Sequence, residues 1–148
     1  MMEKLPPIEK IYEAYSAIAD KRVDLKEDHG EVFSSDRKKC YTVSFDGNVY
    51  SSNDNSTYWQ GYAGYPVIAV LFLQGKLPLN EKIASCFADV SWNGLNQQFR
   101  RDYAAAAEYV MKQRQLDREA VEKEAEAVYE ALKQLDIVIR RGKLRPVK

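Results

Sequence analysis

The sequence predicts a mainly α-helical protein, with four to five helices around a buried central helix and a small β-hairpin or three-stranded antiparallel sheet at the side. The class becomes α+β if that sheet is counted. Two observations carry this prediction. Apolar residues recur at helical spacing along most of the chain, and residues 67–73 are apolar on every side. Only residues 40–52 show a hairpin pattern, with an Asp-Gly turn between alternating segments.

Length and composition predict one domain spanning residues 1–148, because 148 residues with 45% hydrophobic content can bury an ordinary core. The chain has 22 basic and 22 acidic residues, so it has no net charge that would attract nucleic acid or an anionic membrane. The N-terminus lacks a signal-peptide pattern, and residues 67–73 fall far short of the ~20 apolar residues that span a bilayer. We expect a cytoplasmic protein with no membrane partner.

The first helix is predicted to follow Pro6-Pro7, where apolar residues recur at i, i+3 and i+4. Its end is left open between Arg22 and His29-Gly30. Lys21 and Arg22 suit the C-terminal dipole of a helix, whereas the acidic residues that follow do not.

The hairpin is predicted to turn at Asp46-Gly47, because this dipeptide tolerates the positive φ angles of a type I′ turn. This register pairs Phe45 with Asn48 and Val43 with Tyr50. One face of the hairpin would then hold Tyr41, Val43, Phe45 and Tyr50.

The second half of the chain is predicted to be helical. Pro66 opens the central helix, residues 66–74, and Gly75 follows it. Further helices are expected around residues 80–88, from residue 91 past residue 110, and from an N-cap at Asp117. The last helix has coiled-coil-like spacing, and the β-branched run 137–139 is a candidate strand that could join the hairpin.

The most unusual local feature is an aromatic segment, Tyr58, Trp59, Tyr62 and Tyr65, with glycines between its rings. Such rings can stack on bases, sugars or a peptide. They can equally cover the apolar face of the hairpin as part of the core. These four residues are the candidate ligand- or partner-binding site.

Basic residues give a second candidate surface. Arginines and amides on an exposed helix can contact phosphates and bases, but they are also typical of a solvated face. The candidate nucleic-acid residues are Arg100 and Arg101 on the long helix and Arg140, Arg141, Lys143 and Arg145 in the C-terminal tail.

Catalytic and cofactor motifs are lacking in the sequence. His29 is the single histidine, and Cys40 and Cys86 lie too far apart in sequence for a metal-binding motif. The acidic residues around His29 are read as a charged turn. We therefore predict no metal and no cofactor, and the sequence does not favour an enzyme.

Three functions stay open at this point. The leading hypothesis is a small intracellular interaction or regulatory module that binds a protein partner, or itself as a homodimer, through the aromatic segment or the last helix. The alternative is a nucleic-acid-binding protein that uses the long helix and the basic tail. The third is a small-ligand binder or an enzyme at residues 58–65.

Overall fold

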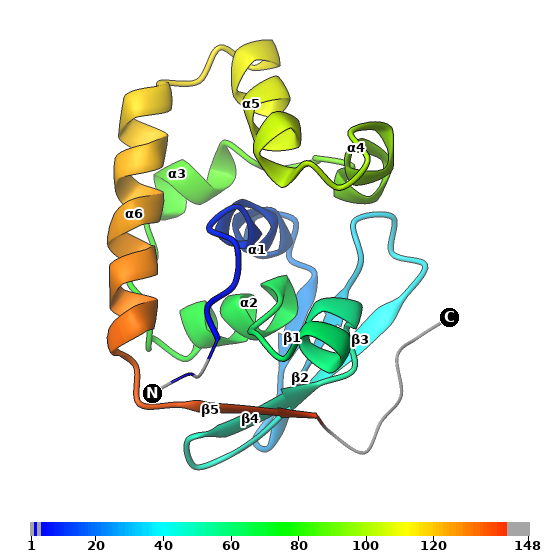
Figure 1. Ribbon diagram of the computed structural model, residues 1–148, viewed down its shortest axis with the longest axis vertical. Coiled ribbons are helices and arrows are strands. Elements are labelled where there is room, and N and C mark those ends of the chain that lie inside the picture. Colours follow the sequence, from blue (N-terminus) through cyan, green and yellow to red (C-terminus); the bar gives the residue numbers. More distant parts are fainter. Residues whose placement is uncertain (1, 3, 142–148) are drawn as a thin grey trace.

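A computed structural model of the protein describes residues 2 and 4–141. Within this part of the chain, six α-helices, one π-helical turn and a five-stranded mixed sheet form an α+β fold (Figure 1). The prediction of a mainly helical protein with a small antiparallel hairpin or three-stranded sheet is wrong. The sheet is larger than expected and contains a parallel pair.

The sheet has the strand order β1-β2-β3-β4-β5. Its strands are β1 (Val23–Leu25), β2 (His29–Phe33), β3 (Cys40–Asp46), β4 (Val49–Ser52) and β5 (Val138–Arg141). The first four strands pair antiparallel in chain order, whereas β5 runs parallel to β4. The run 137–139 therefore does join the hairpin. A parallel partner requires a long crossover, and all the helices after β4 lie in that connection.

The largest error concerns residues 20–33, which the sequence left as a helix end or a charged turn. Helix α1 (Lys10–Ala19) ends before Asp20, and β1 and β2 follow. Only Gly30 and Val32 of these two strands are buried, and the other positions are half-buried or exposed. Because charged residues occupy many of those outer positions, the two-residue periodicity of the strands is hidden in the sequence.

The hairpin turns at Gly47-Asn48, so Phe45 pairs with Tyr50 and Asp46 with Val49. Gly47 has a φ of 59°, which suits glycine in such a turn. The register differs from the predicted one by two residues. A shift of two keeps every side chain on its expected face, and Val43 and Tyr50 are fully buried.

Two helices form the centre of the molecule. Helix α2 (Tyr65–Leu73) is buried from Pro66 to Phe72, as the sequence predicts, and packs between the sheet and α1. Helix α1 contacts α3 (Glu81–Ser85) and α6 (Arg118–Gln134) as well. Figure 1 shows α1 between α2 on one side and α4 (Trp92–Gln98) and α5 (Tyr103–Gln113) on the other. Helix α1 is consequently buried over residues 10–17.

The single long helix predicted from residue 91 is two helices, α4 and α5. Arg100 and Arg101 adopt positive φ angles of 52° and 64° and break the helix between them. Asp102 then caps α5, because its side chain accepts a hydrogen bond from the Ala105 backbone N–H at 3.1 Å.

Helix α6 begins at the predicted cap, where Asp117 accepts from the Ala120 N–H at 3.2 Å. Its apolar stripe is buried inside its own chain and consists of Val121, Ala125, Val128 and Leu132. None of the helices in residues 4–141 has both the length and the apolar character needed to cross a bilayer.

A substitution at Gly30 tests the packing of α2 on the sheet. A Cβ at Gly30 would lie 2.8 Å from Cγ2 of Val70, a stiff β-branched side chain. We expect Gly30→Ala to lower the free energy of unfolding by about 1–3 kcal/mol, measured by urea denaturation. In the double variant with Val70→Ala, the loss should be smaller than the sum of the single losses. Additive losses would contradict this contact.

Gly94→Ala is the matched control, because a Cβ at this helical position meets only Ser91 Oγ, at 3.3 Å. Its stability should stay equal to the parent or rise by up to about 1 kcal/mol, as expected for glycine to alanine in a helix.

Candidate functional site

A cavity of about 470 Å³ opens where α1, β3, the segment 54–65, α4 and the start of α5 meet. This segment contains the π-helical turn η1 (Ser56–Gln60). Small-molecule sites typically have roughly 300–1,000 Å³. The wall is formed by Lys10, Glu13, Tyr41, Asp54, Asn55, Ser56, Trp59, Gln60, Tyr62, Tyr65, Asn93, Asn96, Arg101 and Tyr103.

A buried ion pair forms the α1 side of the cavity. Lys10 Nζ lies 3.2 Å from Glu13 Oε2, and both side chains are only 7% exposed. The Lys10 ammonium also lies 4.0 Å from the ring centroid of Tyr103, a cation–π contact. Asn96 Nδ2 donates to Glu13 Oε1 at 3.4 Å. Helices α4 and α5 thus contribute side chains that satisfy the buried charges of α1.

Burial governs the titration of this pair. Burial raises the pKa of Glu13, and Lys10 and Asn96 offset only part of that rise. The nearby carboxylate of Asp54 raises the pKa of Glu13 further. Burial lowers the pKa of Lys10, but Glu13, Tyr103 and Tyr62 more than compensate, so this pKa lies above its ordinary value. Lys10 is therefore charged at neutral pH.

Asp54 forms the opposite wall and caps η1. Its Oδ2 accepts a hydrogen bond from the Thr57 N–H at 3.1 Å, and its carbonyl accepts from the Tyr58 N–H at 2.9 Å. The Thr57 hydroxyl in turn accepts from the Gly64 N–H at 3.0 Å. A Cβ at Gly64 would collide with the Asp54 carboxylate, so glycine is required for this close approach.

Two buried acceptor oxygens, on residues that line the cavity, have no partner among the described residues. Asp54 Oδ1 and Asn96 Oδ1 are buried, and neither accepts a hydrogen bond from any residue that the structure describes. A buried polar atom without a partner costs about 1–3 kcal/mol, and native proteins contain few of them. Both lie on residues that line the same cavity.

Aromatic rings form much of the remaining wall. Trp59 is 62% exposed, whereas Tyr62 is buried and Tyr65 is half-buried. Tyr41 packs edge-on against Tyr65 with the centroids 6.3 Å apart. Burial raises the pKa of both Tyr41 and Tyr65, so their hydroxyls stay protonated at neutral pH.

The structure brings together residues that the sequence assigned to two different sites. Trp59, Tyr62 and Tyr65 of the aromatic segment line the cavity, and so does Arg101 of the nucleic-acid candidates. Tyr58 does not line it; instead its ring lies 4.7 Å from Trp59 in an edge-on contact.

The other basic candidates have different positions. The Arg141 guanidinium lies 4.5 Å from the Tyr58 centroid and 5.6 Å from that of Trp59. Arg100 and Arg140 are exposed and do not line the cavity. Lys143 and Arg145 lie outside the described residues.

Sequence reasoning did not single out several wall residues, namely Lys10, Glu13, Tyr41, Asp54, Asn55, Ser56, Gln60 and Tyr103. Lys10 and Glu13 have the i, i+3 spacing of an exposed ion pair, and nothing local shows that α1 is buried. Asp54 was the one exception with a local signal. An Asp whose carboxylate accepts from the backbone N–H three residues later is typical of a helix start, so a short helix could have been predicted after Asp54.

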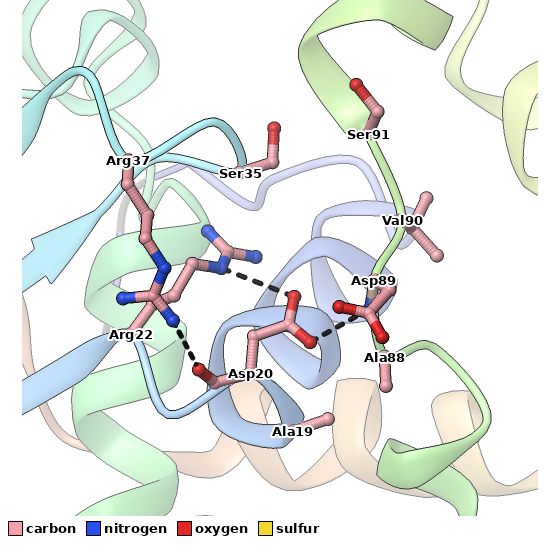
Figure 2. Close-up of a pocket in the computed structure, with 9 residues that line it drawn as sticks. All are labelled: Ala19, Asp20, Arg22, Ser35, Arg37, Ala88, Asp89, Val90 and Ser91. Atoms are coloured by element: carbon pink, nitrogen blue, oxygen red, sulfur yellow. Dashed lines mark hydrogen bonds and ion pairs between the residues drawn. The ribbon is translucent and has the colours of Figure 1, made fainter.

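A second cavity, of about 420 Å³, lies beside the C-terminal end of α1 (Figure 2). Asp20 connects several of the groups that line it. The Asp20 carboxylate accepts from the Asp89 N–H at 2.8 Å and lies 3.5 Å from Arg22 Nε, while Arg37 Nη2 donates to the Asp20 carbonyl at 2.9 Å. This network fastens the end of α1 to the loop before α4, which is a structural role.

Metal and thiol chemistry receive no support in the described part of the chain. No three His, Cys, Asp or Glu residues there gather into a group that could hold a metal ion. Asp28 and His29 form a surface pair with 2.7 Å between Oδ1 and Nδ1. Burial raises the pKa of the Cys40 thiol, which disfavours the reactive thiolate.

Comparison with known proteins gives a family without an assigned activity. A family model described as Uncharacterised conserved protein UCP014422 matches residues 3–138, a range that includes the whole cavity wall. No curated protein and no solved structure shows significant similarity to the chain.

Lys10→Met tests the buried ion pair. The variant leaves Glu13 buried without its cation, so we expect a loss of about 3–5 kcal/mol in the free energy of unfolding at pH 7. The pKa of Glu13 is already raised by burial and rises further without Lys10. Protonated Glu13 needs no counterion, so the loss should shrink as the pH falls towards 4. Urea denaturation at several pH values measures it.

Lys133→Met is the control, since Lys133 and Glu130 also form an i, i+3 pair, at 2.9 Å, but on the surface. Its loss should be much smaller than that of Lys10→Met at pH 7 and should change little with pH. Equal losses in the two variants, or a Lys10→Met loss that does not change with pH, would contradict a buried pair.

Proposed function

The chain belongs to the family of Uncharacterised conserved protein UCP014422, whose description names no activity, so we propose a function from the geometry of the cavity. The proposal is that the cavity between α1, α4 and η1 binds a small polar molecule. This corresponds to the third hypothesis from the sequence. The observation that carries it is the cavity of about 470 Å³, whose wall combines the buried Lys10–Glu13 pair with polar side chains and the aromatic residues Trp59 and Tyr62.

Two wall residues, Asp54 and Asn96, each have one unpartnered oxygen, and structural roles account for their other polar atoms. Asp54 Oδ2 caps η1, and Asn96 Nδ2 donates to Glu13. Neither role needs the remaining oxygen. Both oxygens have almost no accessible surface, so a ligand would reach them only after the two side chains rotate.

The charges of the wall are mixed. Lys10 and Glu13 neutralise each other on the α1 side, the Asp54 carboxylate accepts a hydrogen bond from the Thr57 N–H, and Arg101 adds a positive charge. These groups can both donate and accept hydrogen bonds, which suits a polar ligand. The ring faces of Tyr62 and Trp59 provide an apolar surface for a planar or cyclic part of the same molecule.

The exposed apolar side chains offer less to a protein partner. The buried stripe of α6 is not available for self-association. The large exposed hydrophobic residues in the described chain lie on separate elements and are Leu5, Leu25, Trp59, Leu73 and Tyr109. A partner at the aromatic segment stays a prediction.

A fragment screen tests the proposal. Small polar compounds, namely polyols, amines, carboxylic acids, nucleosides and phosphorylated compounds, are added to ¹⁵N-labelled protein. We expect at least one class to shift the Trp59 indole N–H and the Asn96 side-chain amide together, because both residues line the cavity. Perturbations confined to other regions, or none from any class, would overturn the proposal.

Asn96→Leu and Gln97→Leu form a matched pair of variants on α4. Asn96→Leu removes a polar side chain from the cavity wall and should weaken the best fragment by about tenfold, which corresponds to about 1.4 kcal/mol. Gln97 is exposed and lies outside the cavity wall, so Gln97→Leu should leave the affinity unchanged.

A further inference from the structure

We propose that a groove between α1, α5 and α6 binds a lysine side chain that belongs to a segment of a partner protein. The groove has a volume of about 170 Å³ and shares no wall residue with the cavity between α1, α4 and η1. Figure 1 shows α5 and α6 as neighbouring helices joined by a short loop. This inference goes beyond the proposed small-molecule site and does not depend on it.

The floor of the groove is apolar. Ile8 lies just before α1, Tyr12 lies on α1, and Met111 lies on α5. Ala104 and Ala107 of α5 also line the groove, and their methyl groups are too small to fill the space beside α1. A hydrocarbon chain can pack on this floor, because the removal of apolar surface from water is favourable.

The Tyr12 hydroxyl is a polar group on this floor. Tyr12 as a whole is only 4% exposed, and its ring stacks on Phe87 with the centroids 5.1 Å apart. The hydroxyl forms no hydrogen bond with a described residue and, unlike the oxygens of Asp54 and Asn96, it is not fully buried. Since Tyr12 lines the groove, its hydroxyl oxygen can accept a hydrogen bond from a ligand there.

Carboxylates make the rim of the groove negative. Glu9, Glu122 and Glu126 line it, and Arg118 is the one basic residue in the same wall. Arg118 is already paired, with 2.6 Å from its Nε to Glu122 Oε1 and 3.2 Å from its Nη1 to Glu108 Oε1. Glu9 and Glu126 form no ion pair with another residue of the described chain. The rim therefore has two carboxylates that lack a cation.

The titration of Tyr12 reflects these charges. Burial is the main cause that raises the pKa of Tyr12 to about 12. Glu122, Glu9 and Glu126 raise this pKa further, and Arg118 lowers it. Three carboxylates against one guanidinium give a negative potential at the hydroxyl, which favours a cation in the groove.

A lysine side chain matches this combination of groups. Its methylene groups can pack on the apolar floor while its ammonium donates three hydrogen bonds. The acceptors come from different elements, since Tyr12 is on α1, Glu9 precedes that helix and Glu126 is on α6. A rotatable ammonium suits such an arrangement better than the rigid, planar fork of arginine.

The size of the groove favours a side chain of a protein over a free small molecule. Its volume of about 170 Å³ lies below the roughly 300–1,000 Å³ of small-molecule sites. The groove can hold one side chain, whereas the rest of the partner would lie outside it against the carboxylates of the rim.

Methyl NMR spectra of the full chain test the proposal. The probe is a peptide, acetyl-Ser-Leu-Ala-Lys-Ala-Leu-Ser-amide, and in the comparison peptide norleucine replaces lysine. At millimolar concentration the lysine peptide should shift the methyl signals of Ile8 and Met111 together, because both residues line the groove. It should bind about tenfold tighter than the norleucine peptide, which lacks the charge-assisted hydrogen bonds.

Two pairs of variants place the peptide in the groove. Glu126→Gln should weaken the lysine peptide by about threefold, as expected for one exposed charge contact, whereas Glu119→Gln should not. Glu119 is exposed on the same helix but lies outside the wall. Ala104→Leu should fill the groove and abolish binding, whereas Ala127→Leu, at another exposed alanine, should leave the affinity unchanged.

Tyr12→Phe separates binding from stability. The variant should weaken the lysine peptide and leave the norleucine peptide unaffected. Its unfolding midpoint in urea should equal that of the parent, because the hydroxyl has no partner in the described chain.

Four results would overturn the inference. The first is the absence of shifts at Ile8 and Met111 with the lysine peptide. Equal affinities of the lysine and norleucine peptides would show that the groove selects an apolar side chain. Equal weakening by Glu126→Gln and Glu119→Gln would show that general charge attracts the peptide. Pentylamine that binds as tightly as the lysine peptide would identify a free amine as the ligand. None of these results bears on the proposed small-molecule site, whose fragments are detected at Trp59 and Asn96.

Discussion

The burial of α1 is the constraint on which the rest of the structure depends. This helix carries Lys10, Glu13 and Ser16 and is nonetheless enclosed from residue 10 to residue 17. Each of these buried polar groups needs a partner. Lys10 pairs with Glu13 on the same helix at 3.2 Å, whereas the Ser16 hydroxyl donates to the Phe87 carbonyl at 2.6 Å and accepts from the Trp92 indole N–H at 2.7 Å. The two Ser16 bonds hold the chain before α4, and the start of α4, against α1.

The candidate site follows from that arrangement. Ser16 and Glu13 of α1 accept hydrogen bonds from Trp92 and Asn96 of α4, and the cavity opens beside Lys10 and Glu13. On the other side, the capping of η1 by Asp54 and the close approach of Gly64 fix the aromatic segment between β4 and α2. The two walls are therefore set by hydrogen bonds within the chain, which favours a preformed site over one that assembles on binding.

The sequence was informative where a signal is local. It predicted the all-apolar α2, the side-chain faces of the hairpin and the cap at Asp117. The prediction failed where contacts between distant parts of the chain determine the local structure. The strands β1 and β2 carry charged outer positions that resemble a turn, and the break at Arg100 and Arg101 has neither glycine nor proline to mark it. The site was found in part: the aromatic segment marked one wall, but the burial of Lys10 and Glu13 depends on helices that follow much later in the chain.

A ¹³C-detected pH titration of the Glu13 carboxyl group in the folded protein tests the central claim that α1 carries a buried ion pair at the cavity wall. Burial raises the pKa of this group, so the account predicts a midpoint above the ordinary value of 4.5. A midpoint at or below 4.5 would contradict the account, because Lys10, Asn96 or water would then stabilise the carboxylate more than burial destabilises it.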